Sequence, residues 1–154
     1  MKEITKERTK VEKYTVYQAS DGAEFINYEE CKKYEDSALG VVRGNVAKLI
    51  VGRTDSAWEL MGGNDDNSVI AVKMNCVADV DLVKQLFLLE HPYYDSDERK
   101  EAKQKKFDII EDAYNNNDVV LFGINCDGDY YFINSRLNII SNLNSLDKKE
   151  AKEI

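Results

Sequence analysis

The sequence predicts an α+β domain in which an antiparallel sheet of about five to six strands is covered by three to four helices. Two Asp-Gly dipeptides, Asp21-Gly22 and Asp127-Gly128, each lie between β-favouring runs. Asp-Gly supplies the positive φ that a tight hairpin turn requires, so each pair of runs is expected to form an antiparallel hairpin. A helical segment follows each hairpin, which indicates a sheet built from ββα-type hairpin-helix units.

The N-terminal unit is the clearest of these. Strands are expected over residues 14–19 and 23–26, and a helix capped by Asn27 is expected to run to about Ser37. Gly40 and Gly44 predict a loop, and residues 46–51 a third strand. Residues 56–61 are ambiguous between a strand and a helical turn, and residues 62–67 predict a loop.

The second half of the chain repeats this plan after a central strand. The strand is expected over residues 69–74. A largely buried helix follows this strand and is expected to run to about Glu90, because Pro92 prevents its continuation. A long helix over residues 95–114 leads to strands at 119–125 and 130–133 and a final helix. Both hairpins end in Phe-Ile-Asn before a helix, so an internal duplication and a coincidence are both left open.

Length and composition indicate one globular domain over residues 13–146. Residues 1–12 are expected to be a polar tail or helix, and residues 147–154 a solvated tail. Hydrophobic residues make up 43% and charged residues 32% of the 154 residues, which is typical of a folded domain. The chain has no apolar run of membrane-spanning length and no secretory signal pattern, so we expect a cytoplasmic protein.

The distribution of charge favours a basic protein partner. The net charge is −8, and residues 54–72 and 107–135 contain acidic residues but no Lys or Arg. Nucleic-acid binding requires clustered basic residues, so direct contact with nucleic acid is not expected. A partner protein with a basic surface fits this charge, and ordinary solubility of an acidic protein is the plainer explanation of it.

No motif predicts catalysis, a cofactor or a metal. His91 is the sole histidine, and no base or nucleophile is placed beside it by the sequence. The Asn125-x-Asp127-x-Asp129 pattern starts like a calcium loop, but Arg136 stands where the bidentate Glu belongs. Three widely spaced cysteines argue against a disulfide framework and a zinc site. We therefore expect a protein without enzymatic activity, and leave that point open.

Exposed tyrosine beside acid is typical of protein recognition surfaces. Alternation along a strand places one of Tyr130 and Tyr131 toward the core and the other outward. The predicted partner-binding residues are acids and aromatic side chains near turns: Trp58, Glu59, Asp65, Asp66, Tyr93, Tyr94, Asp127, Asp129, Tyr130 and Tyr131. Each of these residues could also have no binding role, the acids being solvated surface residues and the aromatic side chains lying at the edge of the core.

Within residues 14–36, the order Tyr17-x-Ala19-x-Asp21-Gly22-x-x-Phe25, followed by Glu30-Cys31-x-x-Tyr34-Glu35, resembles the N-terminal segment of small bacteriophage-encoded accessory proteins. The resemblance covers about 25 residues and carries no functional residues over. It implies a phage protein made in the cytoplasm of a bacterial host. Such proteins often bind and inhibit a host factor, including defence nucleases.

Three functions remain in competition. The first is a non-catalytic phage-encoded inhibitor or modulator of a host defence or nucleic-acid-binding protein, acting through an acidic, Tyr-containing surface. The second is a sequestering module for a small molecule or signalling nucleotide, with Arg43, Arg53 and Arg136 converging on a pocket. The third is a metal-dependent hydrolase of nucleotides or nucleic acid, with Asp65, Asp66 and Asp127 as ligands. A homodimer is left open in each case.

Overall fold

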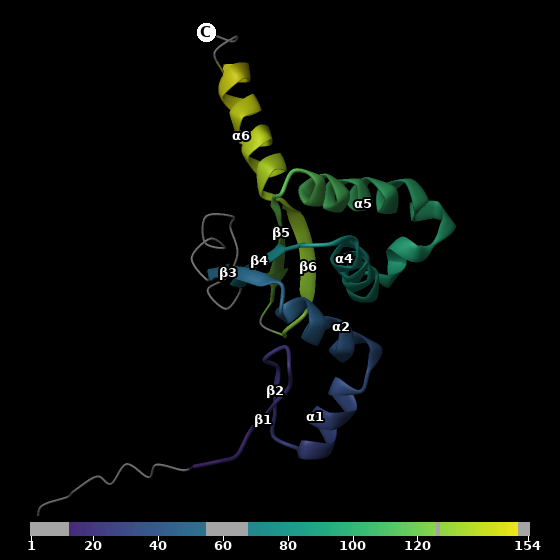
Figure 1. Ribbon diagram of the computed structural model, residues 1–154, viewed down its shortest axis with the longest axis vertical. Helices are drawn as coiled ribbons and strands as arrows, with labels where there is room; N and C mark the ends of the chain where they lie inside the picture. The colour runs from purple at the N-terminus through teal and green to yellow at the C-terminus, as the bar shows by residue number, and fades with distance from the viewer. Residues whose placement is uncertain (1–12, 55–67, 126, 151–154) are drawn as a thin grey trace, which may run out of the picture.

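The computed structural model describes residues 13–54, 68–125 and 127–150, which form an α+β fold (Figure 1). In chain order, with η for 3-10 helices, the elements are β1 (Tyr17–Gln18), β2 (Glu24–Phe25), α1 (Tyr28–Glu35), α2 (Ala38–Ala47), β3 (Ile50–Thr54), β4 (Ser68–Lys73), α4 (Val77–Glu90), η1 (Pro92–Asp95), η2 (Asp97–Arg99), α5 (Lys100–Asn115), β5 (Val119–Ile124), β6 (Tyr130–Ser135) and α6 (Arg136–Glu150). The predicted α+β class and the antiparallel pairing are confirmed.

The six described strands form two antiparallel sheets instead of a single sheet. Strands β3, β4, β5 and β6 pair in that order, whereas β1 and β2 pair only with each other. The β1–β2 hairpin pairs over two residues per strand and contacts α1. Its turn packs on α2, because a Cβ atom added to Gly44 would lie 3.0 Å from Ser20 Oγ. The hairpin therefore packs on α1 and α2, and it does not pair with the larger sheet.

The core lies between one face of the larger sheet and the helices α2, α4 and α5. Figure 1 shows α4 and α5 on the same side of this sheet. Alternate residues of the central strands point into this core, and Phe87 of α4 packs edge-on against Phe132 with ring centres 5.9 Å apart. The fully buried strand and helix residues are Val46, Ile70, Val72, Val83, Leu86, Phe87, Ile110, Val120 and Phe122. This alternation is the reason that β4, β5 and β6 form close to their predicted positions.

The predicted loop at Gly40 and Gly44 is wrong, because both glycines lie inside α2. Ser37 caps this helix, and its Oγ accepts a hydrogen bond from Gly40 N at 3.0 Å. A Cβ atom at Gly40 would lie 2.0 Å from the carbonyl oxygen of Tyr34. The glycine therefore permits close contact between α1 and α2, and does not mark a break in the helix.

Several boundaries differ from the predicted ones. Strand β3 begins at Ile50, because Val46 belongs to α2 and is fully buried there. The long helix is preceded by the short η2, so α5 begins at Lys100. Helix α6 runs to Glu150, so the expected domain end at residue 146 falls inside a helix. Residues 56–61 and 62–67, and the predictions made for them, lie outside the described residues.

The two ββα units do not pair with each other around the central strands. The second hairpin, β5–β6, belongs to the larger sheet, whereas the first stands apart. Their helices also differ in position, since α1 lies beside its own hairpin and α6 projects from the opposite end of the molecule (Figure 1). The glycines of both turns have positive φ, +93° at Gly22 and +82° at Gly128, as the Asp-Gly pattern predicts.

Candidate functional site

The two Asp-Gly turns, which are far apart in the sequence, line the same cavity. It has a volume of about 500 Å³ and lies between the N-terminal hairpin and the β5–β6 turn. We call it the two-turn cleft. It is lined by Asp21, Gly22, Ala23, Glu24, Phe25, Tyr34, Arg43, Arg53, Ile124, Asp127, Gly128 and Tyr130. It is the part of the described structure in which charged and aromatic side chains from both hairpins meet.

Arg43 of α2 is the centre of the hydrogen bonds beneath this cleft. Its Nε donates to Glu90 Oε1 at 2.5 Å, and a second guanidinium nitrogen donates to the Tyr34 hydroxyl at 3.0 Å. The Tyr34 hydroxyl in turn donates to Asp21 Oδ2 at 2.6 Å. The guanidinium carbon also lies 4.6 Å from the centre of the Tyr130 ring. Arg43 therefore joins the N-terminal unit to α4 and β6.

The charge states of these groups follow from burial and from their partners. Burial disfavours the cation of Arg43, but hydrogen bonds with Glu90 and Tyr34 outweigh it and raise the guanidinium pKa. Burial and the hydrogen bond to Asp21 raise the pKa of Tyr34, and burial with the nearby Asp21 raises the pKa of Tyr130. Both phenols therefore stay neutral at physiological pH, and Arg43 stays charged.

The walls of the cleft carry carboxylates that are not neutralised. Glu24 and Asp127 form no ion pair or side-chain hydrogen bond within the described part of the chain. Asp21 accepts from Tyr34 and from its own turn, at Ala23 N. Of the two lining arginines, Arg43 is paired with Glu90, and Arg53 donates to Ser68 Oγ at 2.9 Å. The lining is thus mixed in charge, with a small excess of acid.

The acidic turn after β5 is held by its first asparagine. Asn125 Oδ1 accepts hydrogen bonds from the backbone N–H groups of Asp127 and Asp129, at 3.0 and 2.9 Å. This side chain therefore completes the turn, as Asn commonly does. It leaves the Asp127 carboxylate exposed at the wall of the cleft.

The predicted partner-binding residues are divided between several places. Asp127 and Tyr130 line the two-turn cleft, whereas Asp129 is exposed on the same turn without lining it. Tyr130 is buried and Tyr131 is on the opposite face of the sheet, where its ring occupies the space that a Cβ atom of Gly123 would need. Trp58, Glu59, Asp65 and Asp66 lie outside the described residues.

The tyrosine pair of η1 lies at the end of α4. Tyr93 is exposed and its ring centre lies 4.6 Å from that of Tyr94, which packs in turn on Phe87. Neither lines the cleft. His91 precedes them, and its Nε2 accepts a hydrogen bond from Phe132 N at 3.4 Å. Burial lowers the pKa of His91, so the imidazole stays neutral and can accept this hydrogen bond from β6.

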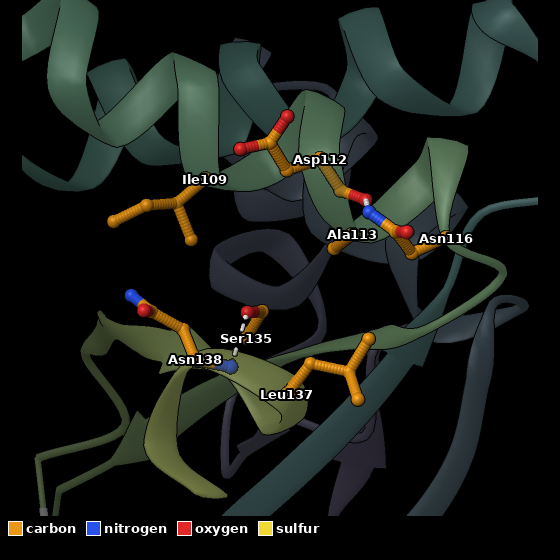
Figure 2. Close-up of a pocket in the computed structure, with 7 residues that line it drawn as sticks. All are labelled: Ile109, Asp112, Ala113, Asn116, Ser135, Leu137 and Asn138. Carbon is orange, nitrogen blue, oxygen red and sulfur yellow. Dashed lines mark hydrogen bonds between the residues drawn. The ribbon is translucent and has the colours of Figure 1, made fainter. Parts of the chain in front are cut away.

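A smaller cavity of about 270 Å³ separates α5 from the start of α6 (Figure 2). Asp112 is the only ionisable residue among its described lining residues, and Figure 2 shows its carboxylate pointing away from Ser135 and Asn138. The polar groups that remain are already bonded, since Ser135 Oγ accepts from Asn138 N and Asn116 donates to the Asp112 carbonyl. The described lining of this cavity therefore provides few groups that could bind a ligand or take part in a reaction.

The structure also bears on the two alternative functions, the metal-dependent hydrolase and the small-molecule sequestering module. Within residues 13–54, 68–125 and 127–150, no three His, Cys, Asp or Glu side chains are grouped so as to hold a metal ion. Of the three arginines considered for a sequestering pocket, Arg43 and Arg53 line the cleft, whereas Arg136 pairs with the buried Asp118 at 2.9 Å. None of the described helices is both long and apolar enough to cross a membrane.

Sequence reasoning missed the central group of this site, formed by Asp21, Tyr34 and Glu90. The sequence predicts Asp21 only as a turn residue and Glu90 only as a helix end, and Tyr34 is named only within the resemblance. The pattern that pointed nearest to the cleft was the pair of Asp-Gly turns, but their convergence depends on how α2 positions the first hairpin.

No protein-family model matches the chain, and comparisons with curated proteins and with solved structures found no match.

Proposed function

We propose that the protein is a non-catalytic binding protein that holds a basic partner protein at the two-turn cleft. One observation carries the proposal: Glu24 and Asp127, from hairpins far apart in the sequence, line one cavity with no ion pair among the described residues. Carboxylates placed in this way attract and orient a basic surface. The net charge of −8 acts in the same direction over longer distances.

The biological setting is a further part of the proposal. The resemblance of residues 14–36 to phage accessory proteins supports a phage protein in the bacterial cytoplasm that inhibits or modulates a host factor. A host nucleic-acid-binding protein, such as a defence nuclease, has the basic surface that this cleft fits.

The test is affinity purification from a bacterial lysate with the wild-type chain and two charge-matched double variants. Glu24→Gln with Asp127→Asn removes the two unpaired carboxylates of the cleft, whereas Glu98→Gln with Asp129→Asn removes two exposed acids that do not line it. We expect a basic protein to be captured by the wild type and the second variant, and about tenfold less by the first. Capture should also weaken at high salt, because exposed charges are screened. Equal capture by both variants, or a co-purifying nucleotide with no protein partner, contradicts the proposal.

A second candidate is supported by the two arginines in the same cleft. Arg43 and Arg53 line it together with two tyrosines, a set that suits an anionic small molecule such as a nucleotide. This function predicts that a nucleotide raises the melting temperature of the wild-type chain, and that Arg53→Gln abolishes the effect. Arg43→Gln is unsuitable here, because it removes the bonds to Glu90 and Tyr34.

A further inference from the structure

The Tyr130 hydroxyl is the feature of the cleft that the proposed function leaves unexplained. Tyr130 is only 6% exposed, its side chain lines the cleft, and its hydroxyl makes no hydrogen bond within the described part of the chain. The ring is held in place by Arg43 above it, and the backbone N–H donates to Glu90 Oε2 at 3.3 Å. The hydroxyl is not among the fully buried polar atoms of the described residues, so a water or a bound group in the cleft is expected to complete its hydrogen bonds.

The charges around this hydroxyl show which kind of group fits. Arg43 is neutralised by Glu90, and Asp21 is occupied by Tyr34 and by the turn. Arg53 already donates to Ser68. Glu24 and Asp127 remain as acceptors, and the neutral Tyr130 hydroxyl supplies another in the lining of the same cleft. A bound group should therefore be a cation with several hydrogen-bond donors.

From this arrangement we infer that the cleft takes the guanidinium group of an arginine side chain of the partner. Guanidinium is planar, carries five N–H donors, and can bond two carboxylates and a hydroxyl at once. A lysine ammonium has fewer donors and is more strongly hydrated, so it fits the spread of acceptors less well. The inference rests on the proposed function and deepens it, because it names the residue type that the basic partner inserts.

The test uses the full chain, labelled with ¹⁵N, and the capped pentapeptide Gly-Gly-Arg-Gly-Gly. The backbone amides of Gly22 and Gly128, one in each turn, report binding in the cleft. Matched peptides carry lysine or the uncharged isostere citrulline in place of arginine, and ATP serves as the anionic probe. We expect the arginine peptide to shift both amides and to bind about fivefold more tightly than the lysine peptide. The citrulline peptide should not bind.

Two pairs of variants locate the contact. Asp127→Asn should weaken binding of the arginine peptide about tenfold, whereas Asp129→Asn, a change of equal charge on the same turn, should leave it unchanged. Tyr130→Phe removes only the hydroxyl and should weaken binding several-fold, whereas Tyr93→Phe, outside the cleft, should have no effect.

The outcomes separate this inference from the function on which it rests. If lysine and arginine peptides bind equally, or if Tyr130→Phe has no effect while Asp127→Asn weakens both, the arginine pocket is wrong and the acidic binding cleft stands. If ATP shifts the turn amides and no peptide does, both are wrong and the anion-binding alternative is supported. Failure of every probe to shift Gly22 and Gly128 overturns the arginine pocket, while the lysate experiment decides the binding function separately.

Discussion

At the scale of single residues, the structure depends on a buried ion pair that joins distant parts of the chain. The side chains of Arg43 and Glu90 are 8% and 5% exposed, and their nitrogen and oxygen atoms lie 2.5 Å apart. Tyr34 and Tyr130 supply the remaining contacts of the guanidinium. Removing one member of such a pair leaves a buried charge without compensation, which costs far more than the pair contributes.

Glu90→Gln should therefore lower the free energy of unfolding by about 3 kcal/mol. Urea denaturation at neutral pH measures the loss. Glu101→Gln is the control, because Glu101 pairs with Lys105 on the exposed surface of α5, where water already screens the charges. Similar stability of the two variants would show that Arg43 does not need its carboxylate partner.

At the scale of elements, α2 is the part of the chain whose sequence misled prediction. Two glycines read as a loop, yet they lie in a helix because Ser37 caps it and Val42 and Val46 bury one side of it. Gly40 allows α2 to start directly against the last turn of α1. The position of α2 in turn places Arg43 below the two-turn cleft.

Gly40→Ala should destabilise the protein by about 1–3 kcal/mol, because its Cβ would collide with the backbone carbonyl of Tyr34. Gly52→Ala is the matched control in β3. There the new Cβ would lie 3.9 Å from that of Ala71, an ordinary contact, so stability should be unchanged or slightly higher. Chemical denaturation of both variants tests the prediction, and equal stabilities would refute a close packing role for Gly40.

At the scale of the whole molecule, the N-terminal ββα unit stands beside the larger sheet without joining it (Figure 1). It is held through the contact of α1 with α2 and through the Asp21–Tyr34–Arg43 hydrogen bonds. A unit with so few buried contacts to the core should open more easily than the central strands. The same opening would widen the two-turn cleft.

Hydrogen exchange monitored by mass spectrometry tests this arrangement. Amides of α1 should exchange faster than those of β4 and β5, and Tyr34→Phe should accelerate α1 further, because it removes the hydroxyl that bonds Asp21 and Arg43. Tyr28→Phe, an exposed position on the same helix, should leave the pattern unchanged. Equal acceleration of β4 and β5 by Tyr34→Phe would mean that the unit and the sheet open together.

The sequence by itself determined the α+β class, the two Asp-Gly hairpins, the Asn27 cap and the strands β4, β5 and β6. These depend on local chemistry: positive φ at glycine, a capping side chain, and alternation of apolar residues. Only the tertiary structure decided that the first hairpin stays apart from the larger sheet, that Gly40 and Gly44 lie in a helix, and that Asp21 and Asp127 line one cleft. Those outcomes depend on packing between elements distant in sequence, and the Arg43–Glu90 pair is one such contact, since it joins α2 to α4.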